Sequence, residues 1–266
     1  MQIYKHILLI FMIFFSASSA WGEAKLNIWP VSIQLTPEQK MGAIHLTNKG
    51  ESEVNVQVSA KTWDMDEKGK FIETDTGDFV FYPRLLKILA GEEKTLRVGY
   101  NGDFPPLEKP YRVYIQELPA IKDKQEARDK KMSVGFNLLL KLSVPLFVSP
   151  LTSPPEPEPA VESLEKSDTG LRLSLKNKGT HNFMLLKIGA KLLGKDEKLL
   201  AETEEKRIQR VLPHRQVFLD IPLKTENCPE SQQLILNLYL DKQQNPVTLT
   251  LNLQSGCVLN IGKSNQ

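Results

Sequence analysis

The stretch MSVGFNLLLKLSVPLFVSP, from Met132 to Pro150, decides the fold. Through its first half, apolar side chains alternate with polar ones, and only Leu139 interrupts the alternation. This period of two is typical of a β-strand with one apolar face and one solvated face. The apolar set is Val134, Phe136, Leu138, Leu140 and Leu142. A globular strand usually has about 5–6 residues, so this predicted strand is long.

The neighbours of this strand suggest where it lies. A charged segment, residues 122–131, precedes it, and the proline-rich segment LTSPPEPEP, Leu151–Pro159, follows it. A long strand between a solvated loop and an interdomain linker is expected at the edge of a sheet, where its unpaired N–H and C=O groups invite another chain. Each apolar side chain covered by such a partner would contribute roughly 1.5–3 kcal/mol. The alternative is a core strand covered by its own domain, which is the commoner role of an alternating strand.

The first residues have the features of a signal peptide, predicted to span residues 1–22. Lys5 and His6 form a short basic region, and the apolar run Ile7–Phe15 is too short to span a bilayer. Small residues follow, so that cleavage after Ala20 and cleavage after Gly22 both fit. Because no later run is long and apolar enough for a membrane helix, the mature protein is expected to be exported and soluble.

The rest of the chain predicts an all-β protein of two domains. About 245 residues remain after the signal, enough for two ordinary domains. Short strand-like runs separated by turn signals fill both halves, which indicates two immunoglobulin-like β-sandwiches, at residues 23–150 and 151–266. The first run, Leu26–Leu35, contains Pro30, and a proline inside a strand implies an edge or a bulge. The net charge is only +2 and the charges are mixed, which argues against nucleic acid as a partner.

Cys228 and Cys257 are the only cysteines, and in an exported chain they favour a disulfide. The runs QLILNLYL and VTLTLNL form a predicted hairpin around residues 241–246. If paired residues sum to 485, Leu236 faces Leu249, and the same register places Cys228 opposite Cys257. Directly opposed residues have the Cα spacing that a disulfide requires.

No pattern in the sequence argues for catalysis, a metal or a cofactor. The mature chain has three scattered histidines without ligand spacing, His45, His181 and His214. Ser163 and Lys166 have the S-x-x-K spacing but no supporting motif. Phosphate-binding loops, a nucleophile elbow and paired glycosidase carboxylates are absent from the sequence. A hydrolase therefore has little support.

The sequence resembles the PapD-like pilus-assembly chaperones of the chaperone–usher pathway. The segments that carry the resemblance are YPRLLKILAGEEKTLRV, EKPYRVYIQELP and LLLKLSVPLFVSP, with weaker matches in the second half. The resemblance implies two immunoglobulin-like domains in a boomerang arrangement. It also implies that the long strand is lent to a pilus subunit by β-strand addition, with Val134, Phe136, Leu138, Leu140 and Leu142 as donor residues.

The sequence departs from the family at the site that holds the subunit's terminal carboxylate. Where relatives carry an arginine and a lysine, this chain has Ser32 and Pro145, which cannot form ion pairs. The replacement candidates are Arg112 first and Arg97 second, because a guanidinium binds a carboxylate with two hydrogen bonds. The alternative for both arginines is a surface or cross-strand ion pair.

A second departure concerns the contact between the domains. Ser149 stands where many relatives have an arginine, whereas Glu108 and Asp241 match acidic members of the family's interdomain network. The predicted interdomain residues are therefore Glu108 and Asp241, in a rewired contact.

The predicted function is that of a periplasmic chaperone that caps pilus subunits and delivers them to an outer-membrane usher. Its expected partners are subunits, the usher and, in the free state, a second copy of the chain. The runner-up is a secreted adhesive or ligand-binding module built from two immunoglobulin-like domains. Pull-down of periplasmic partners distinguishes the two.

Overall fold

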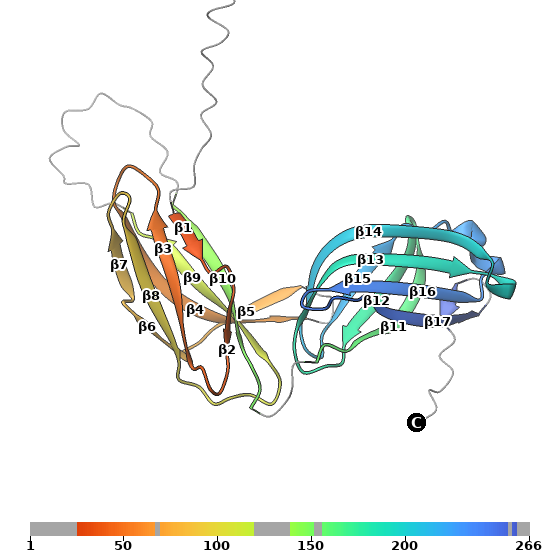
Figure 1. Cartoon of the computed structure of the whole chain (residues 1–266), viewed down its shortest axis with the longest axis horizontal. Helices are drawn as coiled ribbons and strands as arrows, with labels where there is room; N and C mark the ends of the chain where they lie inside the picture. The colour runs from red at the N-terminus through yellow and green to blue at the C-terminus, as the bar shows by residue number, and fades with distance from the viewer. Residues whose placement is uncertain (1–25, 67–69, 120–138, 152–155, 255–256, 260–266) are drawn as a thin grey trace, which may run out of the picture.

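The computed structural model describes residues 26–66, 70–119, 139–151, 156–254 and 257–259, and these form two β-sandwiches, as Figure 1 shows. Strands β1–β10 build the first sandwich, and strands β11–β18 build the second. The prediction of an all-β chain with two immunoglobulin-like domains is confirmed. No helix among the described residues has both the length and the apolar character needed to cross a membrane.

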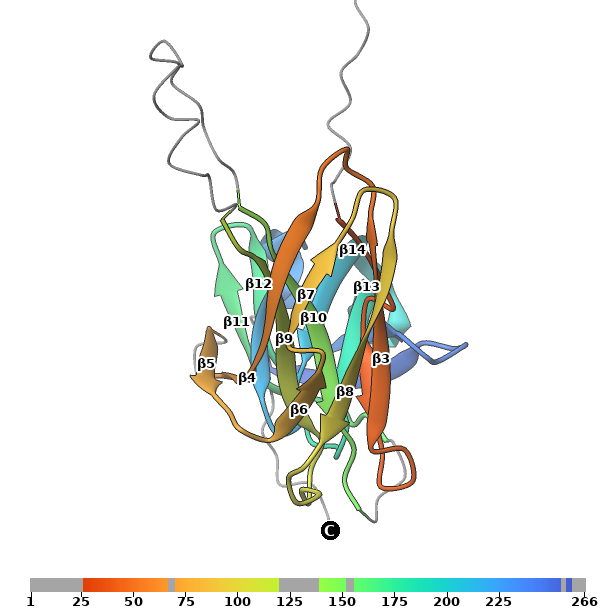
Figure 2. The same cartoon turned by 90° about the vertical axis from the view of Figure 1, so that its left-hand side faces the viewer.

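The first sandwich consists of two sheets, which we call A and B. Sheet A has the order β1 (Leu26–Trp29), β3 (Met41–Asn48), β8 (Glu93–Tyr100) and β6 (Phe79–Tyr82). Sheet B has the order β2 (Ile33–Leu35), β10 (Lys141–Val148), β9 (Lys109–Glu117), β4 (Val54–Met65) and β5 (Phe71–Asp75), and β7 (Leu85–Ile88) also pairs with β4. Figure 2 faces this domain and shows β3 and β8 of sheet A beside β4 and β9 of sheet B. Alternate side chains of both sheets meet in one core.

Pro30 separates two strands that the sequence predicted as one. β1 pairs with β3 in sheet A, whereas β2 pairs with β10 in sheet B. The chain therefore changes sheets at the proline, which has no N–H to donate to a ladder. Each strand lies at the end of its sheet order, so the predicted edge position of this segment is confirmed.

The strand at the centre of the sequence prediction is shorter in the structure, where β10 spans Lys141–Val148. Val134, Phe136 and Leu138 lie outside the described residues. Within β10 the even-numbered positions continue the predicted apolar parity, and they pack into the core of their own domain. Those side chains are Leu142, Val144, Leu146 and Val148. The core interpretation therefore holds for the C-terminal half of the stretch, and the donor interpretation stays a prediction.

The second sandwich also has two sheets, C and D. Sheet C contains β11 (Pro159–Ser167), β12 (Gly170–Asn177) and β15 (Gln216–Ile221). Sheet D contains β14 (Leu199–Val211), β13 (Phe183–Leu193), β16 (Gln233–Leu240), β17 (Val247–Gln254) and β18 (Val258–Leu259), and two 3₁₀ helices, Lys195–Glu197 and Thr225–Glu230, lie in its connections. Leucine-rich faces of the two sheets form its core.

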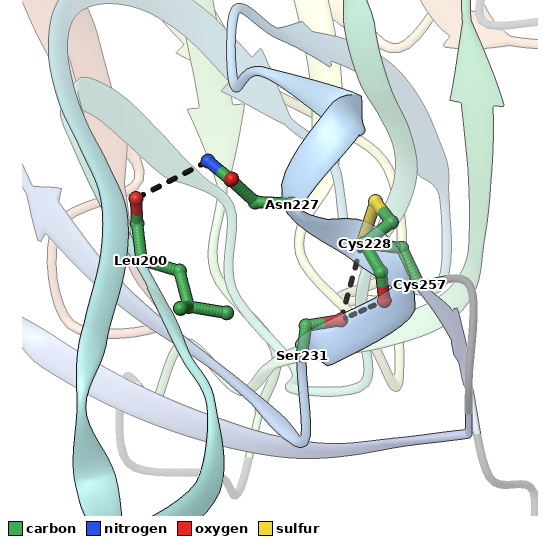
Figure 3. The surroundings of a disulfide bond; sticks show 5 residues. All are labelled: Leu200, Asn227, Cys228, Ser231 and Cys257. Carbon is green, nitrogen blue, oxygen red and sulfur yellow. Dashed lines mark hydrogen bonds between the residues drawn. A yellow bond between two sulfur atoms is a disulfide. The ribbon is translucent and has the colours of Figure 1, made fainter.

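The disulfide joins Cys228 and Cys257, as predicted, with their Cα atoms 4.9 Å apart. The predicted register is also present, because Leu236 faces Leu249 in the β16–β17 ladder. The reason given for the pairing was wrong, however, since that ladder ends at Gln233 and Cys228 lies in the second 3₁₀ helix. Figure 3 shows that helix held by Asn227, which donates to the Leu200 carbonyl.

Candidate functional site: the open edge of β10 and the domain junction

Among the described residues, one side of β10 has no partner strand over most of its length. On its other side, β9 pairs with all of β10 from Lys141 to Val148. β2 covers only the C-terminal end, with Leu146 opposite Ile33 and Val148 opposite Leu35. Among the described residues, the edge from Lys141 to Val144 is therefore unpaired. The predicted edge position is present in this half of the strand.

The direction of the backbone groups identifies which residues face the open side. The Ser149 N–H donates to the Leu35 carbonyl on the β2 side, and the Leu140 carbonyl accepts from the Glu117 N–H on the β9 side. Because consecutive residues of a strand point their backbone groups to opposite sides, odd-numbered residues of β10 face the open edge. Lys141 and Ser143 therefore offer both N–H and C=O there, whereas Pro145 has no N–H and its C=O faces Ile33 of β2.

The outer face of sheet B carries cations beside this edge. Lys141 lies with its Nζ 4.3 Å from the centre of the Tyr114 ring. The Arg112 guanidinium lies 4.5 Å from the Trp63 ring centre, and Arg112 is the cross-strand neighbour of Pro145. The sequence predicted a role for Arg112 but none for Lys141, because Lys141 occupies one of the polar positions of an alternating strand.

Arg112 is also held by an acidic neighbour. Its Nε lies 3.6 Å from Glu73 Oε1, and its Nη1 lies 3.5 Å from Ser143 Oγ. Glu73 also accepts a hydrogen bond from the Tyr114 hydroxyl. Burial, followed by this bond to Glu73, raises the pKa of Tyr114 above its ordinary value. The cross-strand ion pair weighed from sequence is therefore present, next to the open edge.

Arg97, the second predicted anchor, lies in a different place. It is on β8 in sheet A, between Ala43 of β3 and Tyr82 of β6, and it is exposed on the outer face of that sheet. The β10 edge belongs to sheet B. Among the described residues, Arg97 therefore lies in another sheet than the donor residue Leu142.

The outer face of sheet A carries several exposed apolar side chains beside Arg97 and His45. Met41 and Val80 both flank Gly99 in one row across the sheet, and they are 69% and 60% exposed. Tyr82, in the next row, is 74% exposed, and Trp29 lies further along against the ring of His45. Clustered exposed apolar side chains of this kind mark interaction sites more often than scattered ones do.

Glu108 lies at the junction of the two domains and is only 4% exposed. Its carboxylate accepts hydrogen bonds from the backbone N–H of Asn182, at 3.0 Å, and from the Asn182 side-chain amide. Gln34 of β2 donates to the other carboxylate oxygen at 3.1 Å. A buried carboxylate requires such donors, because desolvation otherwise disfavours its charged form. Glu108 therefore joins both domains.

Arg210 of β14 is part of the same junction. Its guanidinium lies 4.9 Å from the centre of the Phe147 ring in β10 and donates to the side-chain oxygen of Asn182. Burial lowers the pKa of Arg210, and the nearby charges of Asp241 and Glu108 offset part of this lowering. Asp241 itself accepts a hydrogen bond from Met184 N–H within its own domain, at 2.6 Å.

An ion pair crosses the junction at Asp64 and Arg215. Two hydrogen bonds of 2.7 and 2.6 Å join the guanidinium to the carboxylate. These bonds hold the pKa of Asp64 below its ordinary value and that of Arg215 above it. A cleft of about 760 Å³ also lies between the domains, lined by Gln34, Ser149, His181 and Asp241 among others.

Apolar side chains of the first domain complete the junction. Trp63, Met65 and Phe147 point away from their own core and pack with the buried cluster of the second domain. The sequence contains a signal for this: β4 buries even-numbered residues up to Ala60 and then Trp63 and Met65 at odd positions. Asn182, Arg210 and Arg215 carry no comparable signal, since only the fold brings them to the junction.

His45 lies in the first domain, whereas the backbones of His181 and His214 both hydrogen-bond to Asn177 in the second. His45 pairs with Glu93 at 3.3 Å, and His181 is buried at the junction, where burial lowers its pKa. Among the described residues there is no group of three or more His, Cys, Asp or Glu side chains placed to hold a metal.

Comparison with protein families gives one match. Residues 25–153 match the family model described as "Pili and flagellar-assembly chaperone, PapD N-terminal domain". No curated protein matches the chain.

Several solved structures share the fold. The crystal structure of the CsuC–CsuE chaperone–tip adhesion subunit pre-assembly complex from archaic chaperone–usher Csu pili of Acinetobacter baumannii matches with 20% identity and a TM-score of 0.59, covering 85% of this chain and 98% of that chain. The class 5 fimbriae chaperone CfaA matches with 12% identity and a TM-score of 0.58, covering 86% and 99%. The complex of the SafA pilin with the SafB chaperone from Salmonella enterica matches with 14% identity and a TM-score of 0.55, covering 86% and 96%.

Proposed function

Since the chain is a divergent member of the PapD-like pilus-assembly chaperones of the chaperone–usher pathway, a non-enzymatic family, we propose that it lends the open edge of β10 to a pilus subunit in the periplasm. The observation that carries this proposal is the unpaired edge from Lys141 to Val144. An incoming strand would gain main-chain hydrogen bonds there, and the alternating apolar side chains would set its register. Among similar structures, CsuC–CsuE and SafA–SafB are complexes of a chaperone with a subunit.

The apolar side chains N-terminal to the open edge would fill the groove of the subunit. Leu140 is half-buried but is not part of the domain's own core, whereas Leu142 packs against that core. Val134, Phe136 and Leu138 are proposed to continue the same row. Residues 1–22 are proposed to direct the chain to the periplasm and to be removed there.

Delivery to an outer-membrane usher is the second part of the proposal. The apolar outer face of sheet A, with Met41, Val80 and Tyr82, lies in the sheet opposite β10. A subunit bound at the β10 edge would therefore leave this face free for a second partner.

Co-expression tests the proposed function. A pilus subunit produced in the periplasm together with this chain should be recovered as a soluble complex with it, whereas the subunit alone should aggregate or be degraded. An exposed edge also favours self-association. The oligomeric state of the chain without a subunit is therefore measured by sedimentation beside that of the complex. Recovery of equal amounts of soluble subunit with and without the chain would refute the function.

We propose Arg112 as the anchor of the subunit's terminal carboxylate. Replacing Arg112 with alanine should weaken capture of an intact subunit by about tenfold, because a buried carboxylate left unpaired costs on the order of 1–3 kcal/mol. A subunit with an amidated C-terminus should be affected much less. Affinity is measured by calorimetry or surface binding.

Arg97→Ala is the matched control, since Arg97 is an exposed arginine of the other sheet. It should leave both affinities unchanged. Equal weakening of the intact and the amidated subunit by Arg112→Ala would instead make Arg112 a structural residue that stacks on Trp63 and pairs with Glu73.

A further inference from the structure

The open edge of β10 has a defined end, and the residues beyond it are tied into the domain junction. Pro145 faces the open side and has no N–H, so it cannot donate to a strand laid along that edge. From Leu146 onward the edge is covered by β2, and Ser149 N–H continues this contact with Leu35 O at 2.9 Å.

β2 is a strand of only three residues, and two features hold it. Ile33 and Leu35 are buried in the core, at 6% and 0% exposure. Between them, Gln34 points the other way, and its side-chain amide donates to Glu108 Oε2 at 3.1 Å and to Ser149 Oγ at 2.8 Å. Gln34 lies at the surface, yet its amide reaches the buried carboxylate that also binds Asn182 of the second domain.

We infer that Pro145 and Gln34 form a stop that fixes where a partner strand ends on β10. Pro145 removes the donor at the boundary, and Gln34 pins β2 over the next three residues by linking it to Glu108 and Ser149. The partner is the same subunit strand as in the proposed function, on which this inference therefore rests. The stop assigns that strand to the edge up to Ser143 and excludes it from Phe147 onward.

Amide hydrogen exchange of the free chain tests the Gln34 half of the stop without a subunit. Gln34→Ala removes both side-chain bonds and should speed exchange of the Ser149 amide about three- to tenfold, the effect expected for hydrogen bonds of ordinary strength. Ser149→Ala removes the bond from Gln34 to Ser149 but keeps the bond from Gln34 to Glu108. It should therefore speed exchange of the amide of residue 149 less than Gln34→Ala does.

Gln116→Ala is the matched control, because Gln116 is an exposed glutamine of β9 without a side-chain hydrogen bond to any described residue. It should leave exchange at residue 149 unchanged. Unchanged exchange in Gln34→Ala would overturn the inference, since burial of Ile33 and Leu35 would then hold β2 alone. Faster exchange throughout sheet B in both Gln34→Ala and Ser149→Ala would also overturn it, by showing a general loss of stability.

The subunit complex tests the stop itself. In the wild-type complex the subunit should leave exchange at Phe147 and Ser149 unchanged, and in Gln34→Ala it should slow exchange there as its strand runs further along β10. Subunit protection of Phe147 and Ser149 in the wild type would refute the stop. Failure of the wild type to capture any subunit would refute the proposed function instead, while the exchange data of the free chain would still decide how β2 is held.

Discussion

Replacing Leu140 with aspartate should abolish capture of pilus subunits while the chaperone stays folded. Leu140 is half-buried and lies at the start of the open edge, but it is not part of the domain's core cluster. A carboxylate forced into the apolar groove of a subunit costs several kcal/mol, which lowers the affinity at least about a hundredfold. The measurement is binding of a purified subunit, with the circular dichroism spectrum and the thermal midpoint of each variant recorded beside it.

Leu139→Asp is the control for this variant. Leu139 is the neighbouring residue of opposite parity and is 46% exposed, so an aspartate there stays in water. It should reduce capture far less than Leu140→Asp does. If Leu140→Asp unfolds the free chain but the remaining folded protein still captures subunits, this stretch is ordinary core and not a donor strand.

Loss of the disulfide should destabilise the second domain strongly. Cys228 and Cys257 are buried and 29 residues apart in sequence. Closing a loop of that length stabilises a fold by roughly 3–4 kcal/mol in the chain-entropy model. The Cys228→Ala, Cys257→Ala double variant should therefore lose about that free energy of unfolding and on the order of 10 °C in the Tm of that domain.

Urea unfolding of the oxidised and the reduced protein measures the same quantity. Ser231→Ala is a useful comparison, because the Ser231 hydroxyl donates to the Cys228 carbonyl at 2.7 Å and lies 3.5 Å from Cys257 Sγ, as Figure 3 shows. Its removal should cost only about 1 kcal/mol. Identical unfolding midpoints of the oxidised and reduced protein would show that the cross-link contributes nothing.

Local patterns predicted most of the fold, because alternation and turns are encoded within a few residues. The sequence predicted the strands of both domains, the disulfide pair and the pairing of leucines in the last hairpin. The Pro30 segment shows where prediction from local patterns ends. The proline indicated an edge or a bulge, but a change from one sheet to the other depends on which strands lie nearby. Cys228 is a second example. The register of the hairpin was extended to Cys228 by counting residues, and counting cannot reveal that the strand has already ended at Gln233.

The site was predictable only in part. The open edge followed from the length and position of one stretch, and Glu108 followed from a family resemblance. The contact of Phe147 with the second domain has only one sign in the sequence: Phe147 is an apolar residue at an odd position of LSVPLFV, where the core residues are even-numbered. Gln34, Asn182 and Arg210 are ordinary polar residues in the sequence, and only the packing of one sandwich against the other brings them together.

Hydrogen exchange across β10, in the free chaperone and in its complex with a subunit, tests strand donation most directly. The N–H groups of Lys141 and Ser143 face the open edge, so they should exchange readily in the free protein. They should become strongly protected in the complex, because an added strand accepts from both of them. A stable complex in which Lys141 and Ser143 exchange as fast as in the free protein would contradict donation of this edge.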